Sequence, residues 1–188
     1  LRFQLSPHFL FNFLNNVVTE IQKRPEVAQE MTIRLAEYLR HTLDYRGEMI
    51  VPLVYEIEGS REYLEIERDR FGDRLKVNYD LADDFNDVRV PVFLLQPLVE
   101  NAVKYGMAQS KPPWLIKVRI SQEKEELNIK VSNPGSLTHD NEGNESSGVG
   151  LDVLRRRLAL HYPERSQFIL KQEGELVVAE IKLKGEPC

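Results

Sequence analysis

The first residues of chemical interest lie in the stretch LSPHFLFNFLNN, which begins at Leu5. On a helix, Asn12, Asn15 and Thr19 all fall within about 40° of His8, so the four residues form one polar strip on a strongly apolar segment. An imidazole on such a strip is either an ordinary surface histidine or a reactive group that a ligand and a partner protein can both reach. The four histidines of the chain are too scattered to form a metal site.

A second group of polar side chains lies on one face of the segment 93–105. At 3.6 residues per turn, Pro97, Asn101 and Lys104 share that face, with Glu100 at its margin, while the opposite face is apolar. The amide oxygen of Asn101 suits Mg²⁺, which prefers oxygen ligands, and Lys104 suits phosphate oxygens. The alternative is a polar helix face that only contacts solvent.

A third group combines glycines with the start of a helix. The tripeptide NPG at 133–135 ends a predicted strand, and a long polar loop then leads to Gly148 and Gly150 at the start of a predicted helix. Glycines let backbone N–H groups approach a ligand closely, and a helix N-terminus favours anions. The three arginines that follow lie about 100° apart, so at most one or two can meet a phosphate, and we take Arg155 as the candidate. An ordinary loop with a glycine-rich exit is the alternative.

Composition limits the classes of protein that the chain can represent. It has 188 residues, a net charge of −5, 41% hydrophobic and 29% charged residues, which is ordinary for a globular protein. The negative charge provides no basic field for nucleic acid, and no apolar run approaches the roughly 18 residues of a membrane span. The single cysteine, Cys188, excludes a disulfide or a cysteine-based zinc site within the chain. Because the chain starts inside a motif and without methionine, we expect a piece of a longer protein.

Two helices, predicted over 5–23 and 26–46, must position the first polar strip. The first of them is apolar on several sides, so it must pack against more than one neighbour. One predicted seam consists of Leu10, Leu14, Val17 and Ile21. A hairpin of two helices cannot bury seams this wide, so we predict a dimeric four-helix bundle.

The second and third polar groups belong to a different kind of fold. A helix is predicted at 53–70, and helices at 93–105 and 150–161 interrupt segments in which apolar and polar residues alternate, as in half-buried strands. The predicted strands are 75–81, 88–92, 116–121, 127–132 and 177–183. The fold class is therefore α+β: a dimerisation hairpin over 1–48, followed by an α/β sandwich over 49–188 whose two later helices cover one face of the sheet.

The motifs also resemble a known family. PLVENAVKYG, a strand ending in NPG, and GVGL after a polar loop resemble the ATP-binding boxes of the GHKL superfamily, which includes sensor histidine kinases, gyrase-type topoisomerases and Hsp90-type chaperones. With the motif PHFLFN and the stretches RLAEYLRHTLDY and EIEGSREYLEIERDRFGDRL, the whole chain resembles the bacterial sensor histidine kinases of the autolysin-regulator, LytS-like, type.

The resemblance implies a role for the histidine of the first motif. The family phosphorylates this residue, so His8 is implied to accept the γ-phosphoryl group of ATP. The neutral imidazole is the attacking form, and an unperturbed pKa of about 6.5 leaves it mostly neutral at cytoplasmic pH. Phe9 stands where the commonest class of histidine kinases has an acid, so we take Glu100 as the group that orients or deprotonates His8. Asn12, one turn further on, is a candidate for orienting water during dephosphorylation of a response regulator.

The resemblance also implies a Mg-ATP site. Asn101 is implied to bind Mg²⁺, Lys104 to neutralise phosphate and Tyr105 to flank the adenine. Gly148 and Gly150 are implied to line the phosphate side of the nucleotide, beneath a mobile lid.

The adenine side departs from the family pattern. Asn133, followed by Gly135, stands where the family has a carboxylate that reads the adenine amine; an amide accepts this hydrogen bond less strongly. Val153 replaces a frequent asparagine, and Gly174-Glu175 replaces Gly-Thr in the final hairpin.

The sequence is therefore interpreted as a sensor histidine kinase core that uses ATP and Mg²⁺. Its expected partners are a second copy of the chain and the receiver domain of a response regulator, with no nucleic acid. The expected location is the cytoplasmic portion of a sensor anchored in the inner or plasma membrane. Two alternatives stay open: a degenerate GHKL dimer acting as a scaffold or phosphatase, and a GHKL ATPase without a phosphoacceptor.

Overall fold

A computed structural model of the chain describes residues 7–44, 48–82, 85, 87–137 and 148–188. The helices are α1 (Pro7–Lys23), α2 (Pro25–Asp44), α3 (Leu53–Phe71), α4 (Gln96–Gln109) and α5 (Gly148–His161), with a short 3₁₀ helix η1 (Gly72–Arg74). The strands are β1 (Ile50–Pro52), β2 (Leu75–Leu81), β3 (Arg89–Pro91), β4 (Trp114–Glu123), β5 (Glu126–Pro134), β6 (Ser166–Glu173) and β7 (Leu176–Lys184).

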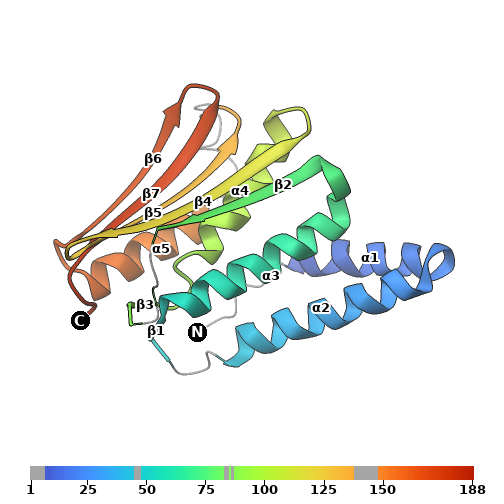
Figure 1. Ribbon diagram of the computed structural model, residues 1–188, viewed down its shortest axis with the longest axis horizontal. Helices are drawn as coiled ribbons and strands as arrows, with labels where there is room; N and C mark the ends of the chain where they lie inside the picture. The colour runs from blue at the N-terminus through green and yellow to red at the C-terminus, as the bar shows by residue number, and fades with distance from the viewer. Residues whose placement is uncertain (1–6, 45–47, 83–84, 86, 138–147) are drawn as a thin grey trace.

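Five strands form the main sheet, in the order β2-β4-β5-β7-β6. The β2–β4 pair is parallel and the other pairs are antiparallel. Helices α3, α4 and α5 lie on one side of this sheet (Figure 1). The predicted α+β class and the helix-covered sheet face are therefore confirmed.

The alternating pattern of the strands explains which face of the sheet is covered. In β4, Ile116, Val118 and Ile120 are buried, while the intervening Lys117 and Arg119 point to the more accessible face. Successive side chains of a strand point to opposite faces, so every second residue enters the core beneath the sheet. The predicted strands of the main sheet are confirmed within one or two residues.

The segment between β2 and α4 differs from the prediction in two ways. The strand predicted at 88–92 is shorter and lies outside the main sheet, because β3 pairs with β1 in a separate two-stranded sheet. The helix predicted at 93–105 begins three residues later, at Gln96. The Glu56 carboxylate accepts hydrogen bonds from the amides of residues 93–95 at 2.7, 2.7 and 3.0 Å. A side chain of α3 therefore satisfies the backbone amides that directly precede α4.

Strand β6 is an element that the sequence analysis missed. It pairs with β7 at the edge of the sheet, and its residues are mostly half-buried without alternation. Phe168, Ile169 and Leu170 follow one another directly, so no period of two marks the strand.

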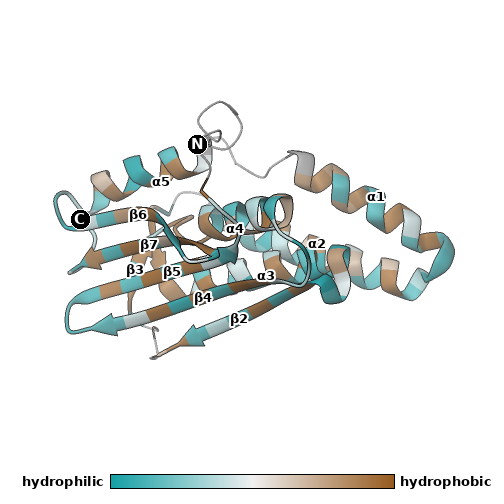
Figure 2. Ribbon diagram, turned by 90° about the horizontal axis from the view of Figure 1, so that it is seen from above, coloured by the Kyte–Doolittle hydropathy of each residue, from teal (hydrophilic) through white to brown (hydrophobic). Residues whose placement is uncertain are grey.

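Helices α1 and α2 form the predicted hairpin, with Arg24 alone between them. Both begin with a proline, which has no amide hydrogen to leave unsatisfied at a helix start. The hairpin lies at one end of the molecule, away from α5, in both views (Figures 1 and 2). No helix in the described ranges is long and apolar enough to cross a membrane.

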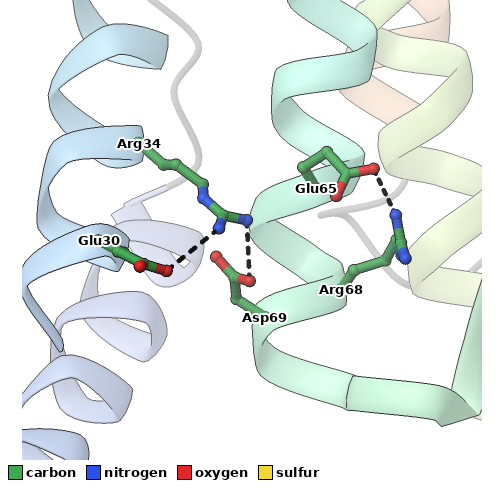
Figure 3. A network of polar contacts seen from close by, with 5 residues as sticks. All are labelled: Glu30, Arg34, Glu65, Arg68 and Asp69. Atoms are coloured by element: carbon green, nitrogen blue, oxygen red, sulfur yellow. Dashed lines mark hydrogen bonds and ion pairs between the residues drawn. The ribbon is translucent and has the colours of Figure 1, made fainter. Parts of the chain in front are cut away.

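The hairpin is seated on α3 through one face of each helix. Its buried residues are Phe13 and Val17 of α1 and Ala28, Met31, Leu35 and Tyr38 of α2. An ion pair joins Arg34 Nη1 of α2 to Asp69 Oδ1 of α3 at 3.0 Å, while Arg34 also approaches Glu30 at 3.7 Å (Figure 3). The hairpin therefore uses α3 of its own chain as a third packing partner.

The outer side of α1 carries an uncovered apolar stripe, formed by Phe11, Leu14, Val18 and Ile21. The predicted seam grouped Leu14 and Ile21 with Val17. Within one chain Val17 is buried and Leu14 and Ile21 are exposed, so burial of the whole seam stays a prediction. The division of the chain at residue 48 and the four-helix bundle stay predictions.

Candidate functional site

The predicted polar face of α4 and the first turn of α5 line a common pocket of about 90 Å³. Its lining residues are Pro97, Glu100, Asn101, Lys104, Tyr105, Gly150 and Leu151. A Cβ added to Gly150 would lie 3.8 Å from Cβ of Pro97, so the start of α5 passes close to α4. Lys104 places its ammonium 5.4 Å from the ring centre of Tyr105. Four sequence-predicted residues from α4 and one from α5 thus come together.

A buried carboxylate and a guanidinium fix the start of α4. Glu56 binds three backbone amides, as described above, and Arg157 donates to the backbone oxygens of Val92 and Phe93. Burial raises the pKa of Glu56, and the amides and the charge of Arg157 oppose that rise. The sequence analysis missed Glu56 because nothing in its local pattern distinguishes it from the other acids of its helix.

Glu100 lies between the pocket and the hairpin. Its Oε1 accepts a hydrogen bond of 2.7 Å from Gln96 Nε2, one turn earlier on α4. Burial raises the pKa of Glu100 to about 7, with the bond from Gln96 lowering it and Glu67 raising it. A carboxyl group in this setting can hold or accept a proton near neutral pH.

A short series of contacts runs from Glu100 to Phe9, the residue that follows the phosphoacceptor candidate His8. His8 belongs to the first turn of α1, and its side chain is outside the described atoms. The next residue, Phe9, packs its ring 5.9 Å from that of Tyr38 and 5.3 Å from that of Tyr63. Tyr38 in turn accepts a hydrogen bond of 2.8 Å from Gln96 Nε2, the group that also binds Glu100.

The polar strip of α1 remains accessible in part. Asn12 is half-buried, and Asn15 and Thr19 are exposed, with Thr19 Oγ1 donating to the carbonyl oxygen of Asn15 at 3.0 Å. Tyr38 and Gln96 were missed by the sequence analysis. The spacing of Gln96 and Glu100, four residues apart on one helix face, is the signal that points to their contact.

Asn133 and Gly135 lie near α4 but outside the lining of the pocket. Asn133 is 2% exposed, and its Nδ2 donates to the carbonyl oxygen of Pro134 at 2.9 Å. A Cβ on Gly106 would lie 3.2 Å from Cβ of Asn133, so α4 approaches the end of β5 closely here. Gly135 has a φ of +142° and donates to the carbonyl oxygen of Glu175 at 3.0 Å.

The predicted phosphate side is described only in part. Gly148 is the first residue of α5, and residues 138–147 of the predicted loop lie outside the described residues. Arg155 donates to Asp152 Oδ1 at 2.9 Å and lies 5.1 Å from the ring centre of Phe168. Neither contact belongs to the pocket lining, so a phosphate role of Arg155 stays a prediction.

The donor set of the pocket fits Mg²⁺ held together with a nucleotide. Asn101 offers one amide oxygen on the pocket wall, and Mg²⁺ usually keeps several waters and phosphate oxygens beside one or two protein ligands. Among the described residues there is no cluster of three or more His, Cys, Asp or Glu side chains that could hold a metal ion alone. The pocket therefore suits a metal that arrives with phosphate.

Comparisons with known proteins show what the chain is similar to. The family model described as histidine kinase matches residues 1–75. Sensor histidine kinase YpdA of Escherichia coli K12 is 31% identical over 171 residues, covering 87% of this chain and 30% of that protein. Sensor protein LytS of Oceanobacillus iheyensis is 29% identical over 201 residues, covering 100% of this chain and 34% of that protein. The chain thus spans about a third of the length of these relatives.

Two solved structures show the same fold. The histidine kinase domain of the blue-light activated histidine kinase of Erythrobacter litoralis has a TM-score of 0.57 and 18% identity, covering 90% of this chain and 92% of that one. Histidine kinase ThkA in complex with response regulator protein TrrA has a TM-score of 0.51 and 13% identity, covering 94% of this chain and 59% of that one.

Proposed function

Because the chain belongs to the family of LytS-like sensor histidine kinases, we propose that it binds Mg-ATP between α4 and α5 and transfers the γ-phosphoryl group to His8. The group then passes to an aspartate in the receiver domain of a response regulator. The observation that carries the proposal is the pocket itself, where Asn101, Lys104, Tyr105 and Gly150 meet beside Glu100.

Each residue of the pocket has a separate role in binding ATP. Lys104 and the backbone amides at the start of α5 neutralise phosphate charge, and Tyr105 flanks the adenine. Asn101 holds Mg²⁺, which screens the charge of the phosphates when it is bound. Phosphoryl transfer requires mainly positioning and charge neutralisation, and these groups supply both.

The transfer step uses His8 and Glu100. A neutral imidazole nitrogen forms a bond to the γ-phosphorus while the bond from that phosphorus to the bridging oxygen of ADP breaks. The proton that the imidazole carries on its other nitrogen is held by Glu100, which orients the ring or accepts that proton. The receiver aspartate then takes the phosphoryl group from the imidazole, and Asn12 orients water when the regulator is dephosphorylated.

The apolar stripe on α1 supports a homodimer. Phe11, Leu14, Val18 and Ile21 follow one another at helical spacing on the side of α1 that α2 and α3 leave open. A second copy of the hairpin covers this stripe and completes a four-helix bundle. We also propose that the chain is the cytoplasmic portion of a sensor anchored in a membrane; its coverage of about a third of its relatives supports only that these relatives are longer.

Incubation with γ-labelled ATP and Mg²⁺ tests the proposal. Acid-labile, alkali-stable label should appear on the chain and should disappear in His8→Gln without loss of ATP binding. Asn101→Ala should lose ATP affinity and label together, whereas Asn15→Ala, on the same strip as His8, should keep both. Acid-labile label on His8→Gln would exclude His8 as the acceptor.

Heterodimers of the two inactive variants test how the catalytic domain reaches its acceptor. If transfer occurs between chains, a mixture of His8→Gln and Asn101→Ala should restore label on the chain that keeps His8. If transfer occurs within one chain, the mixture should stay unlabelled.

Asn133 supports one alternative, a dimer with a weakened nucleotide site. Its side chain is neutral, and its Nδ2 is engaged by Pro134. ATP bound without label or hydrolysis would favour a scaffold or phosphatase, and steady hydrolysis without label would favour an ATPase. Under the kinase proposal, Asn133→Asp should tighten ATP binding, because an ionised acceptor binds the adenine amine more strongly.

A further inference from the structure

One polar contact between the hairpin and α4 has no role in the mechanism above. Gln96 Nε2 carries two hydrogens, and it lies 2.8 Å from Tyr38 Oη and 2.7 Å from Glu100 Oε1. One amide group therefore bridges a residue of α2 and the proposed proton acceptor of α4. The amide of Gln96 can donate to both oxygens at once, because it has one hydrogen for each.

The amide bridge from Gln96 to Tyr38 and Glu100 is partly buried, and its Tyr38 end is tightly packed. Tyr38 is 2% exposed, and its ring contacts the rings of Phe9 and Tyr63 at 5.9 and 6.2 Å between centres. Phe9 directly follows His8 in α1. The hydroxyl of Tyr38 thus has a fixed place only while the hairpin is seated against α3, since Phe9 of α1 and Tyr63 of α3 both pack against its ring.

We propose that Gln96 is a positioning residue that makes the direction of the Glu100 carboxylate depend on the seating of the α1–α2 hairpin. Tyr38 holds the amide of Gln96 in the orientation that binds Glu100. A hairpin that shifts on α3 releases this amide, and Glu100 loses the hydrogen bond that orients its carboxylate. This inference rests on the proposed role of Glu100, and it adds a link from hairpin movement to catalysis.

Transfer rates give the first test. Gln96→Leu should slow autophosphorylation at saturating ATP roughly tenfold, the size expected for losing one hydrogen bond to a charged group. Tyr38→Phe, which removes only the hydroxyl, should slow it less, and the double variant should be no slower than Gln96→Leu. The Kd of ATP should stay within about twofold throughout, because neither residue lines the nucleotide pocket.

Tyr63→Phe is the matched control. It removes another buried hydroxyl from the same aromatic cluster, but that hydroxyl donates to Glu67 at 3.3 Å and not to Gln96. Its transfer rate should stay near that of the unaltered chain. Equal slowing by Tyr63→Phe and Tyr38→Phe would mean that general loosening of the cluster, and not the bridge, sets the rate.

A mutant cycle on folding tests the bridge even if the chain transfers no phosphate. Tyr38 and Glu100 are linked through Gln96, so Tyr38→Phe and Glu100→Gln should be non-additive in the unfolding equilibrium, by roughly threefold or more. The same pair should become additive in a Gln96→Leu background. Additivity in both backgrounds would overturn the inference, whereas absence of label on His8 would overturn only the proposed kinase function.

Discussion

The sheet domain and the hairpin bury their apolar residues to very different degrees. Beneath the sheet, Val118, Ile120, Ile129 and Ile181 are fully buried. On α1, Phe13 is just as buried, yet the stripe beside it leaves Phe11 67% and Val18 63% exposed. The sheet domain therefore buries its apolar residues within one chain, whereas the hairpin leaves an apolar stripe that the proposed second copy would cover.

The polar contacts of the two regions differ in the same way. Glu56 is 5% exposed and satisfies three amides inside the sheet domain. The ion pair that seats the hairpin, between Arg34 and Asp69, has side chains that are 39% and 21% exposed (Figure 3). Exposed pairs of this kind contribute little to stability, so the ion pair itself adds little to the buried apolar contacts that seat the hairpin.

The largest expected effect tests the rigid region. Glu56→Ala should lower the free energy of unfolding by about 3 kcal/mol, because it leaves three backbone amides without their acceptor and removes the negative charge that acts on Arg157. Chemical denaturation measures this loss, and Glu58→Ala, an exposed acid on the same helix, should cost less than about 0.5 kcal/mol. Equal small losses in both variants would show that the start of α4 is held by other contacts.

The next effect tests the incomplete region. Val18→Asp should raise the Kd of the homodimer at least about 100-fold, since a charge would be buried in the bundle, while the unfolding of the sheet domain should not change. Sedimentation at tens of micromolar protein should show monomer for Val18→Asp and dimer for Asn15→Asp, which places the same charge on the polar strip. A dimer in both cases would place the interface elsewhere.

A pH effect on the open face of the sheet should be smaller. Burial alone raises the pKa of Glu180, but hydrogen bonds from Lys171, Lys130 and Asn128 outweigh this and lower the pKa from 4.5 to about 2. Because the folded pKa is the lower one, the carboxylate stabilises the fold above pH 4.5, and this contribution is lost as the pH falls from 4.5 through 2.

We expect about 1–2 kcal/mol from this group, since solvent screens its half-exposed lysine partners. Denaturation at pH 7 and at pH 3 should show a smaller acid-induced loss in Glu180→Gln than in the unaltered chain. Glu123→Gln, at an exposed position of β4, serves as the control and should leave the pH dependence unchanged.

The smallest effect tests the seat of the hairpin. Arg34→Ala should lower the free energy of unfolding by less than about 1 kcal/mol but should speed amide exchange in α2. Arg68→Ala removes a similar ion pair whose partner, Glu65, lies on the same helix, so exchange in α2 should not respond. Faster exchange in both variants would mean that α3 itself has loosened.

The elements that the sequence predicted well are those with one solvent-exposed face and one buried face. The strands of the central sheet alternate because only one face is covered, and this signal is local. Edge strand β6 was missed because both its faces are half-buried, so nothing repeats with a period of two. The start of α4 was misplaced by three residues because a carboxylate from α3, distant in sequence, binds the amides before it.

The residues of the candidate site likewise divide into those that a local pattern predicts and those that only the packing of distant segments brings together. Asn101 and Lys104 could be predicted as one group because a helix places them on one face, and Tyr105 was implied by the family resemblance. These residues line one pocket with Gly150, but that arrangement depends on how α5 packs against α4. Tyr38 and Gln96 lie 58 residues apart, and their hydrogen bond follows only from the seating of the hairpin on the sheet domain.

The pairing of β2 with β4 has a consequence for the order in which the chain folds. Strands β4 and β5, and likewise β6 and β7, are joined by two-residue turns and can pair early. Strand β2 must wait for a partner far along the chain, since the paired residues Asp80 and Arg119 are 39 residues apart. During synthesis the hairpin and α3, on which it sits, are therefore made before the sheet that supports α3 is complete. In that interval the stripe of Phe11, Leu14, Val18 and Ile21 is exposed, so a nascent chain has a period in which it can associate with another copy before its own sheet exists.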